Sequence, residues 1–243
     1  MSNSEEILSN NADLQRILNT VKNLPNASEG GSEDLSAEIE KYASLNTDLE
    51  TVINSLPAAG FTPVQYCAFT GEQIIDTGII CTNNTKIRVL FTRDSSNAMY
   101  MYGVVNSGNT ASVTAYLTSS TGAWRFGAKS ANKAVTVSED LVQTALVDST
   151  GVDFANNSTA ISGVTAFTTI GSLLIGACRS AEGEVGSAQF IGKILLFEMK
   201  EGDTEVLNLI PVVTADGEYC FYDTVSEQFF KSITETPLSG GNL

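Results

Sequence analysis

The chain has 243 residues, with 28 acidic side chains, 13 basic side chains, no histidine and a net charge of −15. Without histidine it has no Ser-His-Asp or Cys-His catalytic unit and no HExxH metal helix. So large a negative charge repels phosphate, which argues against a nucleic-acid partner bound through a broad basic surface.

Four cysteines lie far apart along the chain, with no CxxC pair: Cys67, Cys81, Cys178 and Cys220. We expect reduced, mostly buried thiols in a protein made in the cytosol, and no zinc site. Every apolar run is much shorter than the ~20 residues that a membrane helix needs, and the acidic, polar N-terminus is unlike a secretory signal. The sequence therefore predicts no membrane insertion.

Residues 1–58 have the hydrophobic spacing of two helices, at about 4–24 and 33–56, each ending at a Leu-Pro pair. The apolar seam of the first helix consists of Ile7, Leu14, Ile17, Val21 and Leu24. The seam of the second consists of Tyr42, Leu45, Leu49, Val52 and Leu56. Isolated helices of this length are marginal in water, so these seams need a partner. We predict that residues 1–58 form an oligomerising stem, most simply of a homotrimer; the alternative is a helical hairpin folded on its own chain.

From residue 61 to 243 the residue pattern changes from helical spacing to short β-rich runs separated by turn residues. The expected strands are 85–92, 99–105, 111–117, 123–128, 173–177, 190–199, 205–213, 219–222 and 228–230. Runs of this length with no helical pattern between them are typical of an antiparallel sandwich or jelly roll. The fold class predicted for the whole chain is mainly β, with a jelly-roll domain at 61–243 preceded by the two helices.

Several motifs resemble those of concanavalin-like (laminin-G-like) jelly-roll domains. Residues 66–79 read YCAFTGEQIIDTGI, residues 192–199 read GKILLFEM, and residues 217–230 read GEYCFYDTVSEQFF. The resemblance brackets residues 66–230 and implies a concanavalin-like fold. Such domains are widespread in structural proteins of bacteriophages and prophages, so it also implies a virion setting.

Two of these motifs have physical interpretations of their own. Asp76-Thr77-Gly78 is expected to form a turn in which the Asp76 carboxylate accepts hydrogen bonds from nearby backbone N–H groups. Tyr222-Asp223 followed by Phe229-Phe230 is expected to form a hairpin stabilised by aromatic pairs. Both interpretations are structural rather than ligand-binding.

Catalysis and metal binding find little support in the sequence. A retaining glycosidase needs two carboxylates about 5–5.5 Å apart, and no ExDxE-like strand provides them. The nearest candidates are the pair Glu182 and Glu184, in a glycine-bearing loop, and the pair Glu198 and Glu201, at a strand end. We therefore predict no enzymatic activity.

No cofactor is predicted either. Calcium is possible because hard oxygen donors are abundant, but none of the aspartates forms a DxDxDG loop. The candidate donors are Asp76, Asp94, Asp148, Asp153, Asp216 and Asp223.

A saccharide-binding surface is the remaining candidate site. Tyr100 and Tyr102 share parity on one strand, as do Trp124 and Phe126 on another, so each pair is expected to face one side of its strand. Carbohydrate binding needs exposed aromatic rings beside hydrogen-bonding side chains, and Arg125 and Arg179 could point outward as polar contacts, although nothing in the sequence places them in a common site. The alternative, which the sequence favours, is that the rings fill the core. The candidate ligand contacts are Trp124, Tyr100, Tyr102 and Arg125.

Together these features predict a non-enzymatic bacteriophage virion protein, assembled in the host cytoplasm. Tail fibre, baseplate and head fibre are all compatible. Its expected partners are copies of itself, other virion proteins through the N-terminal helices, and host-surface glycans or proteins through the jelly roll. The alternatives are a purely architectural decoration protein without a ligand and a glycan-cleaving enzyme.

Overall fold

The computed structural model describes residues 60–243 apart from 107, 109, 155–156, 187–188 and 242–243. The two expected helices and both apolar seams fall within residues 1–59 and so lie outside the described residues. Within the described part, no helix is long and apolar enough to cross a membrane.

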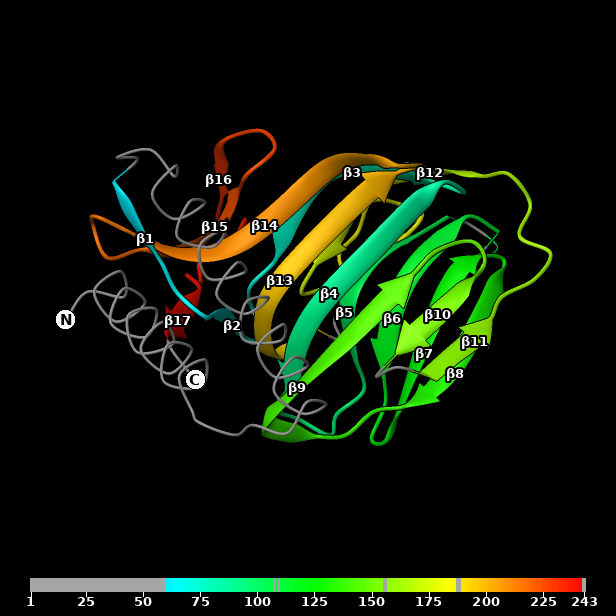
Figure 1. Cartoon of the computed structure of the whole chain (residues 1–243), viewed down its shortest axis with the longest axis horizontal. Helices are drawn as coiled ribbons and strands as arrows, with labels where there is room; N and C mark the ends of the chain where they lie inside the picture. Colours follow the sequence, from blue (N-terminus) through cyan, green and yellow to red (C-terminus); the bar gives the residue numbers. More distant parts are fainter. Residues whose placement is uncertain (1–59, 107, 109, 155–156, 187–188, 242–243) are drawn as a thin grey trace, which may run out of the picture. The chain divides into compact units, whose positions relative to one another are not determined.

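The described residues form two antiparallel β-sheets (Figure 1). In chain order, the first strands are β1 Phe61–Pro63, β2 Tyr66–Thr70, β3 Ile75–Thr82, β4 Thr85–Arg93, β5 Met99–Val105, β6 Ser112–Leu117, β7 Thr121–Gly127, β8 Lys129–Ala134 and β9 Ser138–Val147. They are followed by β10 Gly151–Phe154, β11 Asn157–Ala160, β12 Thr168–Ile175, β13 Ile191–Glu201, β14 Thr204–Thr214, β15 Tyr219–Asp223, β16 Gln228–Phe230 and β17 Ser239–Gly241.

The larger sheet has the strand order β11-β10-β9-β4-β13-β14-β15-β16, with β1 paired to β14, β2 to β13 and β17 to β2. The smaller sheet has the order β3-β12-β5-β6-β7-β8. Figure 1 shows β9, β4, β13 and β14 running side by side across the larger sheet. The strand pairing in these two sheets confirms the expected antiparallel sandwich.

Alternation of apolar and polar residues explains which face each strand buries. On β4, Ile87, Val89 and Phe91 are fully buried, whereas Lys86 and Arg88 face outward. Aromatic rings from the two sheets meet in the core between them: the ring centroids of Trp124 and Phe154 lie 5.2 Å apart, and those of Tyr102 and Phe197 lie 5.6 Å apart. Burial of these large rings supplies much of the force that holds the two sheets together.

Eight of the nine expected strands are present within two residues of their predicted bounds, and the ninth, 173–177, is part of β12, which begins five residues earlier at Thr168. Eight described strands are not among the expected ranges: β1, β2, β3, β8, β9, β10, β11 and β17. Of these, β8 and β11 carry no apolar-polar alternation that could indicate a strand. The sequence left the segment around residues 144–152 undecided apart from a turn at 148–151. That turn is confirmed: the Asp148 carboxylate accepts hydrogen bonds from the backbone N–H groups of Thr150 (2.7 Å) and Gly151 (3.1 Å) between β9 and β10.

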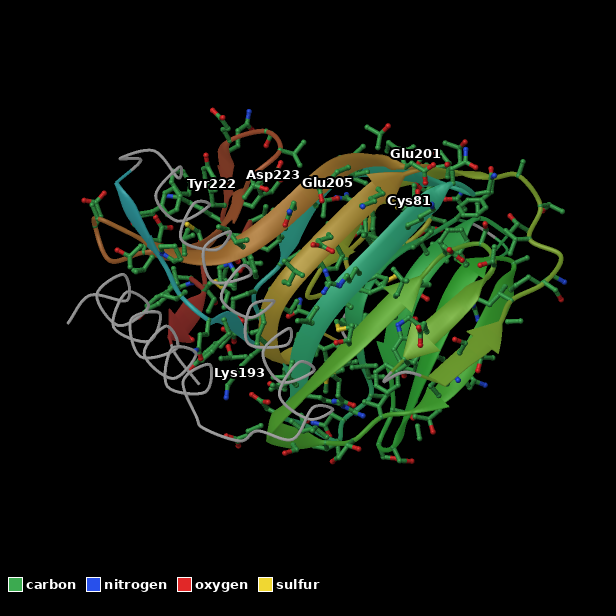
Figure 2. All side chains as sticks on the ribbon, viewed as in Figure 1. Cys81, Lys193, Glu201, Glu205, Tyr222 and Asp223 are labelled. Carbon is green, nitrogen blue, oxygen red and sulfur yellow. The ribbon has the colours of Figure 1, made fainter. Side chains whose placement is uncertain are left out.

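The hairpin interpretation is confirmed, but the Asp76 interpretation holds only in part: Asp76-Thr77-Gly78 lies within β3, where the register against β12 is irregular, and not in a turn. The Asp76 carboxylate accepts a hydrogen bond from the backbone N–H of Gly78 (3.0 Å). In the β15–β16 hairpin Tyr222 pairs with Phe229, with ring centroids 5.4 Å apart. Figure 2 shows Tyr222 and Asp223 beside β14, at the hairpin. The Asp223 carboxylate, almost fully buried, orders the turn by accepting from the backbone N–H groups of Asn208 (2.7 Å) and Ser226 (3.0 Å).

The four cysteines are buried and free, as expected. Burial raises the pKa of Cys81 and Cys178 to about 12 and that of Cys220 to about 11, and it also raises the pKa of Cys67. Thiols with such pKa values stay protonated at neutral pH and behave as small apolar side chains.

Candidate functional site

The four predicted ligand contacts divide between two places. Trp124 and Tyr102 are fully buried in the core, as the alternative interpretation of these rings proposed. The prediction that Tyr100 and Tyr102 face one side is wrong, because the register of β5 against β6 shifts between them. This irregularity inverts the alternation, so Tyr102 points into the core while Tyr100 stays half-buried on the outer face.

Tyr100 and Arg125 do lie together, in a hollow of about 440 Å³ on the outer face of the smaller sheet. Its lining residues come from β5, β6, β7 and β8: Tyr100, Val105, Thr114, Tyr116, Ala123, Arg125, Ser130 and Asn132. On β6 and β7 the intervening residues, such as Ala115 and Trp124, are core residues. The strand alternation that buries one face therefore presents the other face to the hollow.

Strand register arranges the lining side chains in two neighbouring rows. In the first row Tyr100 lies opposite Tyr116 on β6, which lies opposite Ala123 on β7, followed by Asn132 on β8. The ring centroids of Tyr100 and Tyr116 are 4.7 Å apart, and the ring planes are inclined by 50°. The two rings therefore pack against each other at a tilt, and Asn132 lies in the same row two strands beyond Tyr116.

The second row is polar. Gly103 on β5 lies opposite Thr114, which lies opposite Arg125 on β7, followed by Ser130 on β8. Arg125 thus has a hydroxyl-bearing cross-strand neighbour on each side, one row away from the tyrosines. Burial raises the pKa of Tyr100, so its phenol is protonated at neutral pH and is available as both donor and acceptor.

The chain after β12 packs onto the outer side of β5, where it meets the polar row of the hollow. Gly176, with φ of 86°, turns the chain after β12, and its N–H donates to the carbonyl of Met101 (2.7 Å). Cys178 then lies on Gly103: a Cβ added to that glycine would come within 2.7 Å of the Cys178 Sγ and 3.2 Å of Thr114. Gly103 is therefore required for this close approach.

Arg179 attaches this segment to the sheet. Its Nη2 lies 2.6 Å from Oδ2 of Asp76, and its Nε donates to the carbonyl of Ser172 (3.2 Å). The Ser172 hydroxyl donates to the other oxygen of Asp76 (2.5 Å). Asp76, the aspartate of the YCAFTGEQIIDTGI motif, thus joins β3, β12 and the following segment, and it is not among the residues lining the hollow.

The larger sheet carries a second hollow, of about 390 Å³, on its outer face, where two of the three lining cations are in ion pairs. The Nζ of Lys86 lies 2.9 Å from Asp203, and Arg88 Nη1 lies 3.1 Å from Glu198. Both pairs are exposed to solvent and contribute little to the stability of the fold.

The carboxylates considered for catalysis have structural partners or lie in a turn. Glu198 pairs with Arg88, and Glu182 and Glu184 lie in the turn-rich segment after Arg179. Glu201, at the end of β13 near Cys81 in Figure 2, accepts hydrogen bonds from the hydroxyls of Thr82 and Thr85. Neither predicted pair of glutamates lines the hollow on the smaller sheet.

The aspartates considered for calcium are likewise dispersed. Asp76 pairs with Arg179, Asp94 accepts from the Thr92 hydroxyl (3.0 Å), and Asp148 and Asp223 each accept hydrogen bonds in turns. Within the described residues, no group of three or more acidic or cysteine side chains is arranged to hold a metal ion.

Sequence reasoning did not assign Thr114, Tyr116, Ser130 and Asn132 to the site. Parity alone would have placed Tyr116 and Thr114 on one face of their strand, and Ser130 and Asn132 on one face of theirs. What the sequence could not supply was the pairing of β6 with β7 and β8, which brings these side chains beside Arg125.

Comparisons with known proteins find similarity among solved structures. No family model and no curated protein matches the chain. A native heptameric SAP-like pentraxin from Limulus polyphemus is 10% identical, with a TM-score of 0.43 over 55% of this chain and 74% of the pentraxin chain. Domains LG4-5 of the mouse laminin alpha1 chain are 10% identical, with a TM-score of 0.40 over 61% of this chain and 46% of the laminin chain. No functional residue is carried over from either protein.

Proposed function

We propose that the β-sandwich domain binds a saccharide in the hollow on the outer face of the smaller sheet. One observation supports this most directly: the paired rings of Tyr100 and Tyr116 adjoin a row of polar side chains across three neighbouring strands. A pyranose has an apolar C–H face that packs on an aromatic ring, and hydroxyl groups that need partners at its edge.

The polar side chains match the needs of sugar hydroxyls. The Asn132 amide both donates and accepts, the hydroxyls of Thr114 and Ser130 do the same, and Arg125 donates only. A sugar lying on the tyrosines would therefore exchange its water contacts for hydrogen bonds rather than lose them. Because the residues lining the hollow include no carboxylate to act as a general acid, we propose binding without cleavage.

The setting of this binding is proposed on sequence grounds. The motifs shared with concanavalin-like domains favour a bacteriophage virion protein that displays the domain toward host-surface glycans. The apolar seams within residues 1–58 favour homotrimerisation and attachment to other virion proteins through that region. A trimer would present three hollows and so raise the avidity for a repetitive glycan surface.

Substitution of Tyr116 tests the saccharide proposal. Glycans retained by the full-length protein on an array are measured again by calorimetry with Tyr116→Ala and Tyr116→Phe. Loss of the ring is expected to weaken binding by about 10-fold or more, whereas the phenylalanine keeps the ring and most of the affinity. Thermal unfolding of both variants controls for damage to the fold.

Two outcomes would contradict the proposal. If no glycan binds to the full-length protein, the purely architectural role becomes the better account. If a glycan binds but Tyr116→Ala leaves its affinity unchanged, the binding site lies elsewhere. Release of shorter saccharides during these incubations would instead favour a glycan-cleaving enzyme.

A further inference from the structure

Charge is distributed unevenly along this acidic chain. Although it contains 28 acidic residues, none occurs between Asp94 and Glu139, a stretch that carries three cations: Arg125, Lys129 and Lys133. Strands β5 to β8, which form the hollow, lie entirely within this stretch. The part of the smaller sheet that surrounds the hollow is thus positive in a molecule whose net charge is −15.

Arg125 differs from the other arginines on the outer faces. Arg88 and Arg179 each pair with a carboxylate, at 3.1 Å and 2.6 Å. In the part of the chain that the structure describes, no carboxylate lies within ion-pair distance of the Arg125 guanidinium, and no residue lining the hollow is acidic. Its cross-strand neighbours Thr114 and Ser130 are neutral.

An arginine without an anion in a partly enclosed site favours an anionic ligand. The planar guanidinium offers two parallel N–H groups that match the two oxygens of a carboxylate. Charge-assisted hydrogen bonds of this kind are shorter and stronger than those between neutral groups. An acidic residue placed near Arg125 would compete with such a ligand, so the absence of acidic side chains from this stretch is consistent with that role.

We propose that the saccharide bound in the hollow carries a carboxylate, as a uronic or sialic acid does. The carboxylate contacts Arg125, while the sugar ring packs on Tyr100 and Tyr116 in the neighbouring row. This inference rests on the proposed saccharide binding and adds the chemical class of the ligand. It also explains how a strongly acidic protein binds an acidic ligand, since the repulsive charges lie outside β5 to β8.

The test compares acidic oligosaccharides with their carboxyl-reduced forms. Oligogalacturonides, hyaluronan tetrasaccharide and α2,3-sialyllactose are titrated into the full-length protein, each beside the same molecule with its carboxylate reduced to an alcohol. We expect at least one acidic probe to bind, and its reduced form to bind about 10- to 100-fold more weakly, the range expected for a charge-assisted pair. Raising the salt concentration should weaken the acidic probe more than the reduced one.

Variants of Arg125 then assign the contact. Arg125→Gln should lower the affinity for the acidic probe by the same factor and abolish the preference over the reduced form. Arg125→Lys keeps the charge but not the paired N–H groups, and should have an intermediate effect. Arg88→Gln, a matched change on the larger sheet, should leave binding unchanged.

The failure of this inference is distinguishable from that of the proposed function. Equal binding of acidic and reduced probes, or a preference that persists in Arg125→Gln, would overturn the carboxylate assignment and leave saccharide binding standing. A lack of binding by any probe in either form, and by any neutral glycan on the array, would overturn both.

Discussion

The backbone of Glu227 has a conformation that residues other than glycine rarely adopt. Its φ is 58°, and among the described residues it is the one non-glycine residue with positive φ. It lies in the turn between β15 and β16, and its side chain is exposed. An L-residue in this region clashes with its own carbonyl, at a cost of about 1 kcal/mol.

We therefore predict that Glu227→Gly stabilises the protein. The gain should be about 0.5–1 kcal/mol, less than the full relief because glycine also makes the unfolded chain more flexible. It is measured as a rise in the midpoint of urea unfolding. Glu182→Gly, an exposed glutamate without positive φ, should give no gain; an equal gain from both would refute the explanation.

Arg125 and Tyr100 show how far the alternation of residues along a strand predicts which face a side chain occupies. The sequence placed both on a candidate surface, and both line the hollow. It placed Trp124 and Tyr102 there too, although strand alternation puts Trp124 on the opposite face from Arg125. For Tyr102 the register shift in β5 decided the matter, and only the pairing with β6 shows that shift.

At the scale of elements, the segment between β12 and β13 depends on Arg179. This side chain joins the segment to Asp76 on β3 and to Ser172 on β12. The same segment carries Cys178, which packs on β5 next to Thr114. Its attachment therefore affects the wall of the hollow.

We predict that Arg179→Met loosens this segment. Removing one partner of a partly buried, hydrogen-bonded ion pair should lower the free energy of unfolding by about 1–2 kcal/mol. Hydrogen exchange should quicken in residues 176–186 more than in β13, because the segment opens before the sheet does. Arg88→Met, which breaks an exposed pair, should change neither quantity appreciably; unaltered exchange in Arg179→Met would count against the attachment.

For the whole molecule, the buried cysteines predict a loss of stability in alkali. Burial raises the pKa of Cys81 from an ordinary value of 9.0 to about 12, so above pH 9 the unfolded chain releases a proton that the folded chain keeps. The unfolded state then binds fewer protons, and the free energy of unfolding falls as pH rises from 9 toward 12. The contribution of the protonated Cys81 thiol to the free energy of unfolding is fully present below pH 9.

The expected slope is about 1.4 kcal/mol per pH unit for such a thiol. Urea unfolding at pH 8 and pH 10 measures the loss, and Cys81→Ala should lose about 1.4 kcal/mol less between these pH values than the unsubstituted protein. The comparison uses differences within each protein, so the stability that the substitution itself costs does not enter. Identical losses in both proteins would exclude Cys81 as a contributor.

The proposed trimer is also a property of the whole molecule. Sedimentation of the full-length protein should give about three times the chain mass of 25.7 kDa, because paired apolar seams exclude water only when helices associate. Leu14→Asp with Leu49→Asp should yield monomers, since each change puts a charge into a seam. Monomers of the unsubstituted protein at micromolar concentration would contradict the proposal.

The sequence by itself determined nine of the seventeen described strands, the Asp148 turn, the β15–β16 hairpin and the antiparallel sandwich. These features depend on local alternation, on turn chemistry near in the chain, or on motifs that can be compared directly. Asp76 and Asp223 were interpreted correctly as structural residues, because each accepts a hydrogen bond from a backbone N–H within three positions, at Gly78 and Ser226 respectively.

Only the tertiary structure shows which side chains form the hollow on the smaller sheet. Its side chains come from four strands, and their meeting depends on strand order and register, which the local pattern does not encode. The same pairing showed which aromatic rings are core and which face outward. Among the described residues, the structure also showed that Arg88 and Arg179 each have a carboxylate partner and Arg125 has none. Pairing between strands distant along the chain is set by burial over the whole sandwich, and so it appears only once the fold is complete.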